Sequence, residues 1–199
     1  MVDVDVVELD RRTVVTTAEF VAAIRPGDLD RPTPCAGWTV RDLLAHMIGQ
    51  HHGFAVAASG DPTELADWRP RPVGDDPAGG YNESATLVTA AFGAPGVLER
   101  SFWLPEVRTS APFPAAMAIG FHFIDYVVHG WDVARSIGIP VRFDDDLVAA
   151  VLPLAQQVPD APKFRGPGKA FAPGVAVPPG ASPLDRVVAM LGRDPGWTG

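Results

Sequence analysis

The feature that most constrains this chain is one apolar run with a stripe of polar side chains along it. The run begins near Pro114 and stops at Gly138, with Pro140 just beyond. This pattern predicts a helix that ends at a glycine and cannot continue through the proline. At about 100° per residue the stripe spans an arc of about 80°. Its members, with angles relative to the first, are His122, Asp125 (about −60°), His129 (about −20°) and Asp132 (about −80°). Polar groups on a buried face need partners, so we expect this stripe to bind something or to be paired internally.

A metal ion is one candidate partner, and an earlier predicted helix can supply a further ligand. Leu43 and Met47 mark the core-facing side of that helix, and His46 lies next to them. His51 and His52 are rotated by about 140° and 120° from His46 and are expected at the rim or in solvent. His46 is therefore the best partner for the polar stripe, although a lone histidine on an apolar face is more often a satisfied core residue.

Asp125 and His129 are spaced i, i+4, about 6 Å apart along a helix axis, so both can reach one ion. With His46 they would form a site of two imidazoles and one carboxylate that keeps open positions. Such a site suits Zn²⁺, with Ni²⁺ or Fe²⁺ as alternatives. His122 lies about 10 Å from His129 along the axis, so one ion cannot bind the whole stripe. His122 and Asp132 are then candidate catalytic groups, which would orient ligands or move protons.

Two simpler interpretations of these residues stay open. An Asp–His pair at i, i+4 is often only a hydrogen bond on a helix surface. Cys35 is expected to be a small buried apolar residue rather than a nucleophile.

Composition narrows the class of protein. With 199 residues, 47% hydrophobic and 20% charged, the chain fits a globular domain with a real core. A formal net charge of −8 argues against a nucleic-acid or anionic-membrane partner. The longest apolar run falls short of the ~20 residues of a membrane span, and the N-terminus lacks the basic region and apolar core of a signal peptide. A single cysteine, Cys35, suits a reducing compartment, so we expect a cytoplasmic protein.

Helices dominate the predicted secondary structure. They are expected over residues 9–24, 39–59, 82–99, 114–138, 144–157 and 182–192. In the third of these, Gly93, Pro95 and Gly96 are residues that can break the helix before its end. Thr39 and Asp42 form a predicted capping box, and Ser182 followed by Pro183 is a typical helix start. A loop is expected at residues 61–80, and extended structure around residues 102–104. The pattern predicts an all-α fold, with a helical bundle over residues 1–158 and a Pro- and Gly-rich extension over residues 159–199 packed on it rather than an independent domain.

Three stretches resemble the mycothiol-dependent maleylpyruvate isomerase family, within the DinB-like metal-binding superfamily. Residues 34–46 (PCAGWTVRDLLAH) resemble its helix-two signature, and residues 128–135 (VHGWDVAR) resemble its second signature. Residues 185–195 (DRVVAMLGRDP) look like the C-terminal motif of a short-chain branch. The resemblance implies a DinB-like four-helix bundle with one divalent metal, usually zinc. A histidine of helix two and a Glu-x-x-x-His pair would hold that metal.

Those ligands carry over to His46, Asp125 and His129 in this sequence. Asp125 departs from the family pattern, because its carboxylate is one methylene shorter than that of glutamate. The chain also lacks the second domain that supplies basic substrate-binding residues in the isomerase. The basic residues of the tail that could replace them are Lys163, Arg165 and Lys169.

The resemblance implies a metal-dependent, thiol-dependent transferase or isomerase that acts on a small electrophile. A small-molecule thiol, of the mycothiol type, would bind as cosubstrate, and the metal would activate it as a thiolate. A homodimer would suit a helix face that stays apolar. One alternative is a divalent-metal-binding protein without turnover, a sensor or sequestering module. This alternative is favoured if His122 or Asp132 closes the site as a fourth ligand. Another is a purely structural bundle whose histidines and aspartates satisfy one another.

Overall fold

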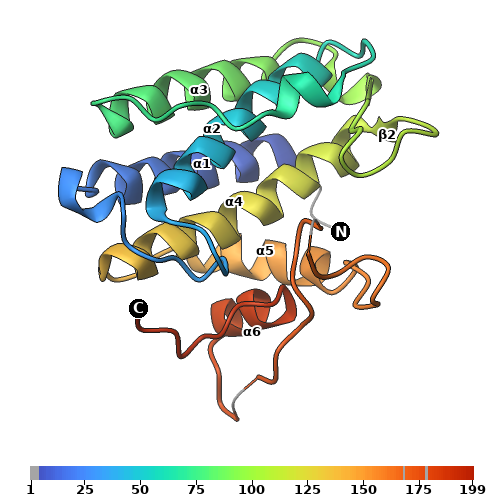
Figure 1. Ribbon diagram of the computed structural model, residues 1–199. Helices are drawn as coiled ribbons and strands as arrows, with labels where there is room; N and C mark the ends of the chain where they lie inside the picture. The colour runs from blue at the N-terminus through green and yellow to red at the C-terminus, as the bar shows by residue number, and fades with distance from the viewer. Residues whose placement is uncertain (1–4, 168, 178) are drawn as a thin grey trace.

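The computed structural model describes residues 5–167, 169–177 and 179–199, and helices dominate it (Figure 1). The bundle consists of α1 (Val6–Ala22), α2 (Val40–Ala57), α3 (Pro77–Phe92) and α4 (Ala115–Ile137). Helix α1 packs against α3 and α4, and α2 packs against α3 and α4. Helices α5 (Asp145–Ala155) and α6 (Pro183–Met190) form a further layer on the far side of α4 (Figure 1). The predicted all-α, four-helix-bundle fold is confirmed. Among the described residues, no helix has the length and apolar character needed to cross a membrane.

Local capping explains where the helices begin and end. The Asp5 side chain accepts from the backbone N–H groups of Val7 and Glu8, so α1 starts earlier than predicted. Thr39 and Asp42 form the predicted capping box of α2. The Ser182 hydroxyl caps α6. Helix α4 ends at Gly138, which has a left-handed φ of 72°, as the glycine predicted.

The third helix starts earlier than predicted, and it ends just before the glycine that was expected to be able to break it. It starts at Pro77, because the Asp76 side chain accepts from the Gly79 N–H and proline suits the first helical position. It ends at Phe92, and the rest of the predicted span becomes the short 3₁₀ helix η3 (Val97–Glu99). Two more 3₁₀ helices, η1 (Pro26–Asp28) and η2 (Leu65–Trp68), lie in connections.

A two-stranded ribbon leads directly into α4. Strand β1 (Ser101–Phe102) pairs antiparallel with β2 (Phe113–Pro114), and Phe102 lies opposite Phe113. The loop between the strands is tied down at both ends: Leu104 is 1% exposed, and the Arg108 guanidinium lies 3.9 Å over the Phe113 ring. The ribbon therefore holds a defined loop beside the first turns of α4.

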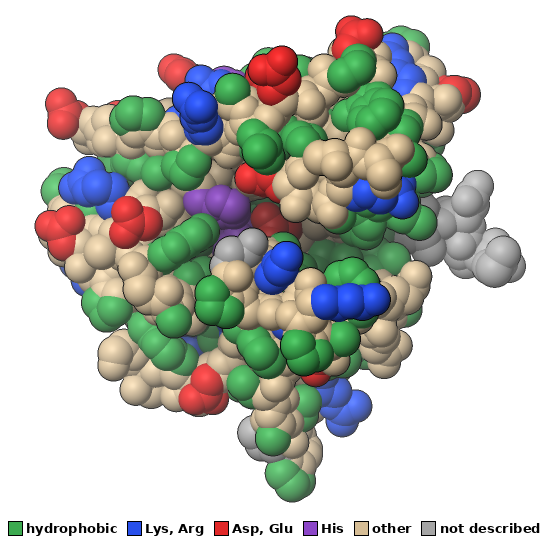
Figure 2. All heavy atoms as spheres, turned by 45° about the vertical axis from the view of Figure 1, so that its right-hand side comes forward, with side chains coloured by type: hydrophobic (Ala, Val, Ile, Leu, Met, Phe, Trp, Pro, Cys, Tyr) green, Lys and Arg blue, Asp and Glu red, His purple; other side chains and the backbone are tan. Residues whose placement is uncertain are grey.

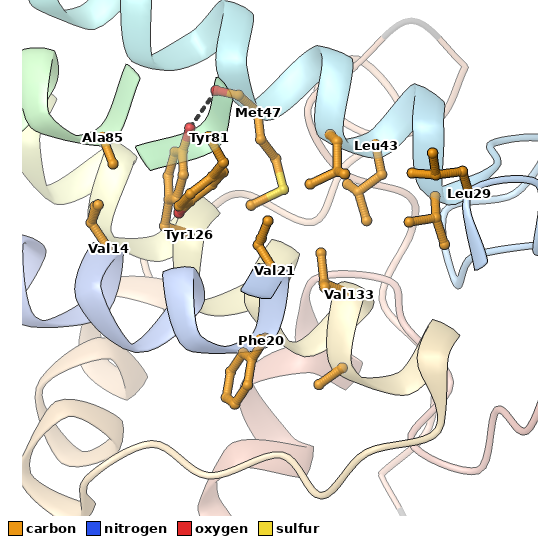
Figure 3. Close-up of a cluster of buried hydrophobic side chains, with 13 residues drawn as sticks. Val14, Phe20, Val21, Leu29, Leu43, Met47, Tyr81, Ala85, Tyr126 and Val133 are labelled. Atoms are coloured by element: carbon orange, nitrogen blue, oxygen red, sulfur yellow. Dashed lines mark hydrogen bonds between the residues drawn. The ribbon is translucent and has the colours of Figure 1, made fainter. Parts of the chain in front are cut away.

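The main core fills the space between the four bundle helices (Figure 3). The Tyr126 hydroxyl of α4 donates to the Met47 carbonyl of α2 inside this core (Figure 3). A separate cluster joins α4, α5 and α6, and the C-terminal residues Val187 and Leu191 are fully buried in it. The C-terminal segment thus shares a core with α4, the helix that carries the polar stripe.

Candidate metal centre

The structure brings the three predicted ligands together. His46 comes from α2, and Asp125 and His129 come from α4; one donor atom from each lies within 4.8 Å of the others. Asp125 Oδ1 is 3.4 Å from His129 Nε2. Donor atoms ~2.1 Å from a tetrahedral ion lie ~3.4 Å from each other, so this spacing fits a divalent ion. The shorter aspartate side chain therefore reaches far enough at this position.

One side of this group is open to solvent. His46 and Asp125 are half-buried, whereas His129 is buried. Figure 2 shows histidine and acidic side chains together in a hollow of the surface, with hydrophobic side chains around it. An ion held there would keep positions that a small molecule can reach.

The second nitrogen of His129 is fixed by a buried carboxylate. His129 Nδ1 lies 3.0 Å from Asp132 Oδ2, and a carboxylate can only accept, so Nδ1 carries the hydrogen. Asp132 is fully buried and is held by Arg193, with Nη2 3.0 Å from Oδ2 and Nε 3.2 Å from Oδ1. Nε2 is therefore the nitrogen of His129 that faces Asp125 and His46. Such carboxylate–histidine pairs orient metal ligands and raise their basicity.

Cys35, expected to be a small buried apolar residue, is partly buried against the main core and also joins this cluster. Its thiol donates to Asp132 Oδ2 at 3.1 Å, and Arg193 Nη2 donates to its sulfur at 3.0 Å. Burial and the charge of Asp132 raise the pKa of the Cys35 thiol. The thiol thus stays protonated at neutral pH and acts as a hydrogen-bond donor.

The surroundings shift the pKa values of the two histidines of the group in opposite directions. Burial lowers the pKa of His46 to about 4, and the charge of His129 adds to this effect. Burial also acts to lower the pKa of His129, but the charge of Asp125 and the hydrogen bond to Asp132 outweigh it and raise the pKa to about 10. Without metal, His46 is neutral and ready to donate its lone pair. His129 is then an imidazolium whose Nε2 proton occupies the place that a cation would take.

His122 does not lie in this group. Its Nδ1 is 2.6 Å from Asp10 Oδ1 of α1, and both residues are fully buried. Its ring stacks on Tyr126 at 4.1 Å. The polar stripe of α4 is therefore shared between two neighbours, because α1 covers one end of it.

The predicted exposure of His51 is wrong. His51 is 0% exposed, its Nδ1 lies 2.8 Å from the Ser84 hydroxyl of α3, and its ring stacks on Tyr126. The reason is that α3 packs along this side of α2. His52, next in the chain, is half-buried.

Comparisons with known proteins identify the family and the fold. The family model of the mycothiol maleylpyruvate isomerase N-terminal domain matches residues 11–134. The chain belongs to this family. Two uncharacterized proteins of Mycobacterium tuberculosis strains are 30% identical over 182 residues, which cover 88% of this chain and 91% of theirs. Crystal structures of the mycothiol-dependent maleylpyruvate isomerase and of one of its mutants superpose with a TM-score of 0.60 at 14% identity. The superposition covers 84% of this chain and 72% of the isomerase chain, so the two proteins share a fold.

The family match contains all three candidate ligands, but other residues at the site lie outside what we predicted from the sequence. Arg193 follows the matched region and reaches Asp132 across 61 positions of sequence. The C-terminal motif was its only signal. Glu106, in the loop between β1 and β2, accepts from the Gln50 side chain, which lies one turn beyond His46 on α2. A single loop glutamate carries no periodic signal.

The tail residues proposed as substitutes for the family's basic residues behave differently from one another. Arg165 is 5% exposed, and its guanidinium donates to the backbone carbonyls of Val158, Pro159 and Ala172. It therefore holds the tail and is not free to bind substrate, which corrects the prediction for this residue. Lys163 and Lys169 are exposed.

Proposed function

We propose that this chain is a metal-dependent, thiol-dependent transferase or isomerase that acts on a small electrophile, with a thiol of the mycothiol type as cosubstrate. The observation that carries the proposal is the open donor group of His46, Asp125 and His129, with His129 oriented by Asp132. Membership of the mycothiol maleylpyruvate isomerase N-terminal domain family supports the thiol.

Each residue of the group has a distinct part. A divalent ion bound here, for which we expect Zn²⁺, would act as a Lewis acid. It would lower the pKa of a thiol, so that a thiolate exists at neutral pH. His46 offers a neutral imidazole, because its burial disfavours the charged form. Asp125 offers a carboxylate oxygen. His129 offers Nε2 once its proton has left, and Asp132 with Arg193 holds the ring in place.

A metal-binding protein without turnover is the main alternative, and a fourth protein ligand would favour it. Asp132 is engaged by Arg193 and by His129 Nδ1, and His122 is engaged by Asp10. The His122 Nε2 has no partner among the described residues, but the ring lies against Asp10 and Tyr126 and is not part of the donor group. Within the described residues, neither candidate therefore joins the three donors as a fourth ligand. This supports an open, reactive centre.

Metal content tests the proposal. Protein purified without an affinity tag and incubated with Zn²⁺ is expected to hold about one ion per chain by elemental analysis, as a single three-ligand site predicts. His129→Ala should lose the ion, because it removes the ligand that α4 and Asp132 hold in place. His52→Ala is the matched control, since this half-buried histidine of the same helix α2 as His46 is not one of the donors; it should keep the ion.

Absence of metal in the unaltered protein would overturn the proposal. The cluster would then be structural, with His129 satisfied by Asp125 and Asp132. Equal metal content in His129→Ala and the unaltered protein would show that the ion binds elsewhere.

A further inference from the structure

A second carboxylate lies beside the candidate metal centre without belonging to its donor group. Glu106 Oε2 accepts from Gln50 Nε2 at 2.8 Å. Gln50 lies four residues after His46, which places both on the same face of α2, about 6 Å apart along the axis. The charge of Asp125 also acts on Glu106. Glu106 thus contacts α2 one turn beyond His46 and is near enough to Asp125 for the charge of that carboxylate to act on it.

The loop that carries Glu106 is held in a defined shape. The backbone N–H groups of Val107 and Arg108 both donate to the Leu104 carbonyl at 2.9 Å, which closes a tight turn around Glu106. Leu104 is buried, and Arg108 donates to the Pro112 carbonyl at 2.7 Å. The turn therefore presents Glu106 from a rigid base.

The contact with Gln50 joins an exposed carboxylate to a buried amide, because Glu106 lies at the surface whereas Gln50 does not. Gln50 is 6% exposed, and a buried amide without a hydrogen-bond partner destabilises the fold. Its side-chain N–H is satisfied by Glu106, across 56 positions of sequence. Partial burial raises the pKa of Glu106, the hydrogen bond from Gln50 acts to lower it, and the charge of Asp125 raises it further. A carboxylate that a hydrogen bond holds beside a reacting group can accept its proton.

We propose that Glu106 is the proton acceptor of this centre and that Gln50 is the residue that positions it. The inference rests on the proposed function, because it assigns the proton that the thiol must lose. The S–H bond of the thiol breaks, sulfur keeps the electron pair, and an O–H bond forms on the Glu106 carboxylate, directly or through one water. The same proton is returned when the thiol leaves, so Glu106 ends each cycle as it began.

The other acidic groups of the cluster are committed elsewhere. Asp125 belongs to the donor group. Asp132 is held by two nitrogens of Arg193 and by His129. Cys35 is hydrogen-bonded within that same pair. Glu106, by contrast, has one oxygen engaged by a neutral amide, and its other oxygen has no hydrogen-bond partner among the described residues.

Proton counting by calorimetry tests this role without a known substrate. The protein is loaded with Co²⁺, and 2-mercaptoethanol is titrated in at pH 7 in two buffers that differ in ionisation enthalpy. The thiolate-to-cobalt absorption band reports thiol binding, and the buffer dependence of the heat gives the protons released. In the unaltered protein we expect clearly less than one proton released per thiol, because Glu106 keeps it. In Glu106→Gln we expect about one proton released, because metal-bound thiolates must shed their proton.

Matched variants test whether the proton count depends on Glu106 and its contact with Gln50 or on any loss of a glutamate. Glu99→Gln, an exposed glutamate of η3, should behave as the unaltered protein. Gln50→Leu keeps Glu106 but removes its hydrogen bond, so its proton count should lie between the other two. Equal proton release in the unaltered protein and Glu106→Gln, with a normal absorption band, would overturn the role of Glu106 alone. A complete lack of the band with any of these proteins would overturn both this inference and the thiol chemistry on which it rests.

Discussion

At the residue scale, His129 is the central residue of the site, because each of its ring nitrogens faces a carboxylate: Nδ1 faces Asp132 and Nε2 faces Asp125. A row of alternating charges runs through the buried end of α4, from the Arg193 guanidinium to Asp132, then to His129 and finally to Asp125. Arg193 keeps Asp132 ionised, since its charge and the His129 contacts outweigh burial and lower the pKa of Asp132. Each group in the row thus fixes the charge and orientation of the next.

This row predicts that Asp132→Asn weakens metal binding although Asp132 is not a donor in the His46–Asp125–His129 group. The amide keeps the shape but no longer enforces a hydrogen on Nδ1, and loss of such a contact typically lowers metal affinity about 10–100-fold. Competition with a chromophoric zinc chelator measures the change. Asp146→Asn is the control, because Asp146 pairs with Arg12 at the exposed start of α5. An unchanged zinc affinity in Asp132→Asn would contradict this role.

At the element scale, close packing of α2 against the connection after it sets the shape of one side of the bundle. A Cβ atom on Gly53 would come within 2.4 Å of the Trp68 ring, and one on Gly49 within 2.5 Å of the Arg69 carbonyl oxygen. Trp68 is 3% exposed, so it has little room to move. The glycines of α2 thus permit η2 to lie directly on the helix.

Gly53→Ala should therefore destabilise the fold, by about 1–3 kcal/mol for an overpacked core position. Gly120→Ala is the matched control in α4, where a Cβ would meet only Leu154 at 3.9 Å. There the alanine should stabilise the helix by about 0.5–1 kcal/mol. Urea unfolding of both variants measures the difference, and equal free energies of unfolding would contradict the packing argument.

Element prediction from the sequence succeeded where a local signal defines an end. The Thr39–Asp42 capping box, the Ser182 cap and Gly138 placed helix termini well, because a cap is a contact between near neighbours. The start of α3 was missed since a Pro-Ala-Gly-Gly start resembles a loop, and only the Asp76 contact with Gly79 shows it to be helical. The angles of the α4 stripe were predictable, but not that Asp10 of α1 covers its His122 end.

The candidate ligands could be predicted for a related reason. Asp125 and His129 share a helical spacing, and His46 lies in a motif with its own pattern. Glu106 and Arg193 reach the site from irregular segments across 56 and 61 positions of sequence from their partners. No local rule fixes such contacts, since they depend on how the whole chain packs.

At the scale of the whole molecule, buried neutral histidines should make the fold sensitive to acid. Burial, with the charges of His122 and His52, holds the pKa of His51 well below its usual value. Its contribution to stability is therefore full above the unfolded pKa of about 6.5 and is lost as pH falls below that value. His46, with a pKa of about 4, contributes in the same direction.

Metal-free protein should lose stability between pH 6.5 and 4.5, with a slope of up to about 1.4 kcal/mol per pH unit from His51. His51→Gln removes that titration and should flatten the slope, whatever its effect on stability at pH 7. Urea unfolding at several pH values measures both slopes. His52→Gln, at a half-buried position, should change the slope less; a slope that His51→Gln leaves unaltered would contradict the assignment.

The contact of Arg193 with Asp132 also determines when the site can be completed during synthesis of the chain. Because translation proceeds from the N-terminus, Arg193 emerges 61 residues after its carboxylate partner, when the four bundle helices have already been made. Until then Asp132 and Cys35 lack their cation, and His129 lacks the support that orients it. The growing polypeptide can thus form its bundle first and complete the metal centre only as a late step of biosynthesis, so a message that stops before codon 193 would yield a bundle without a finished site.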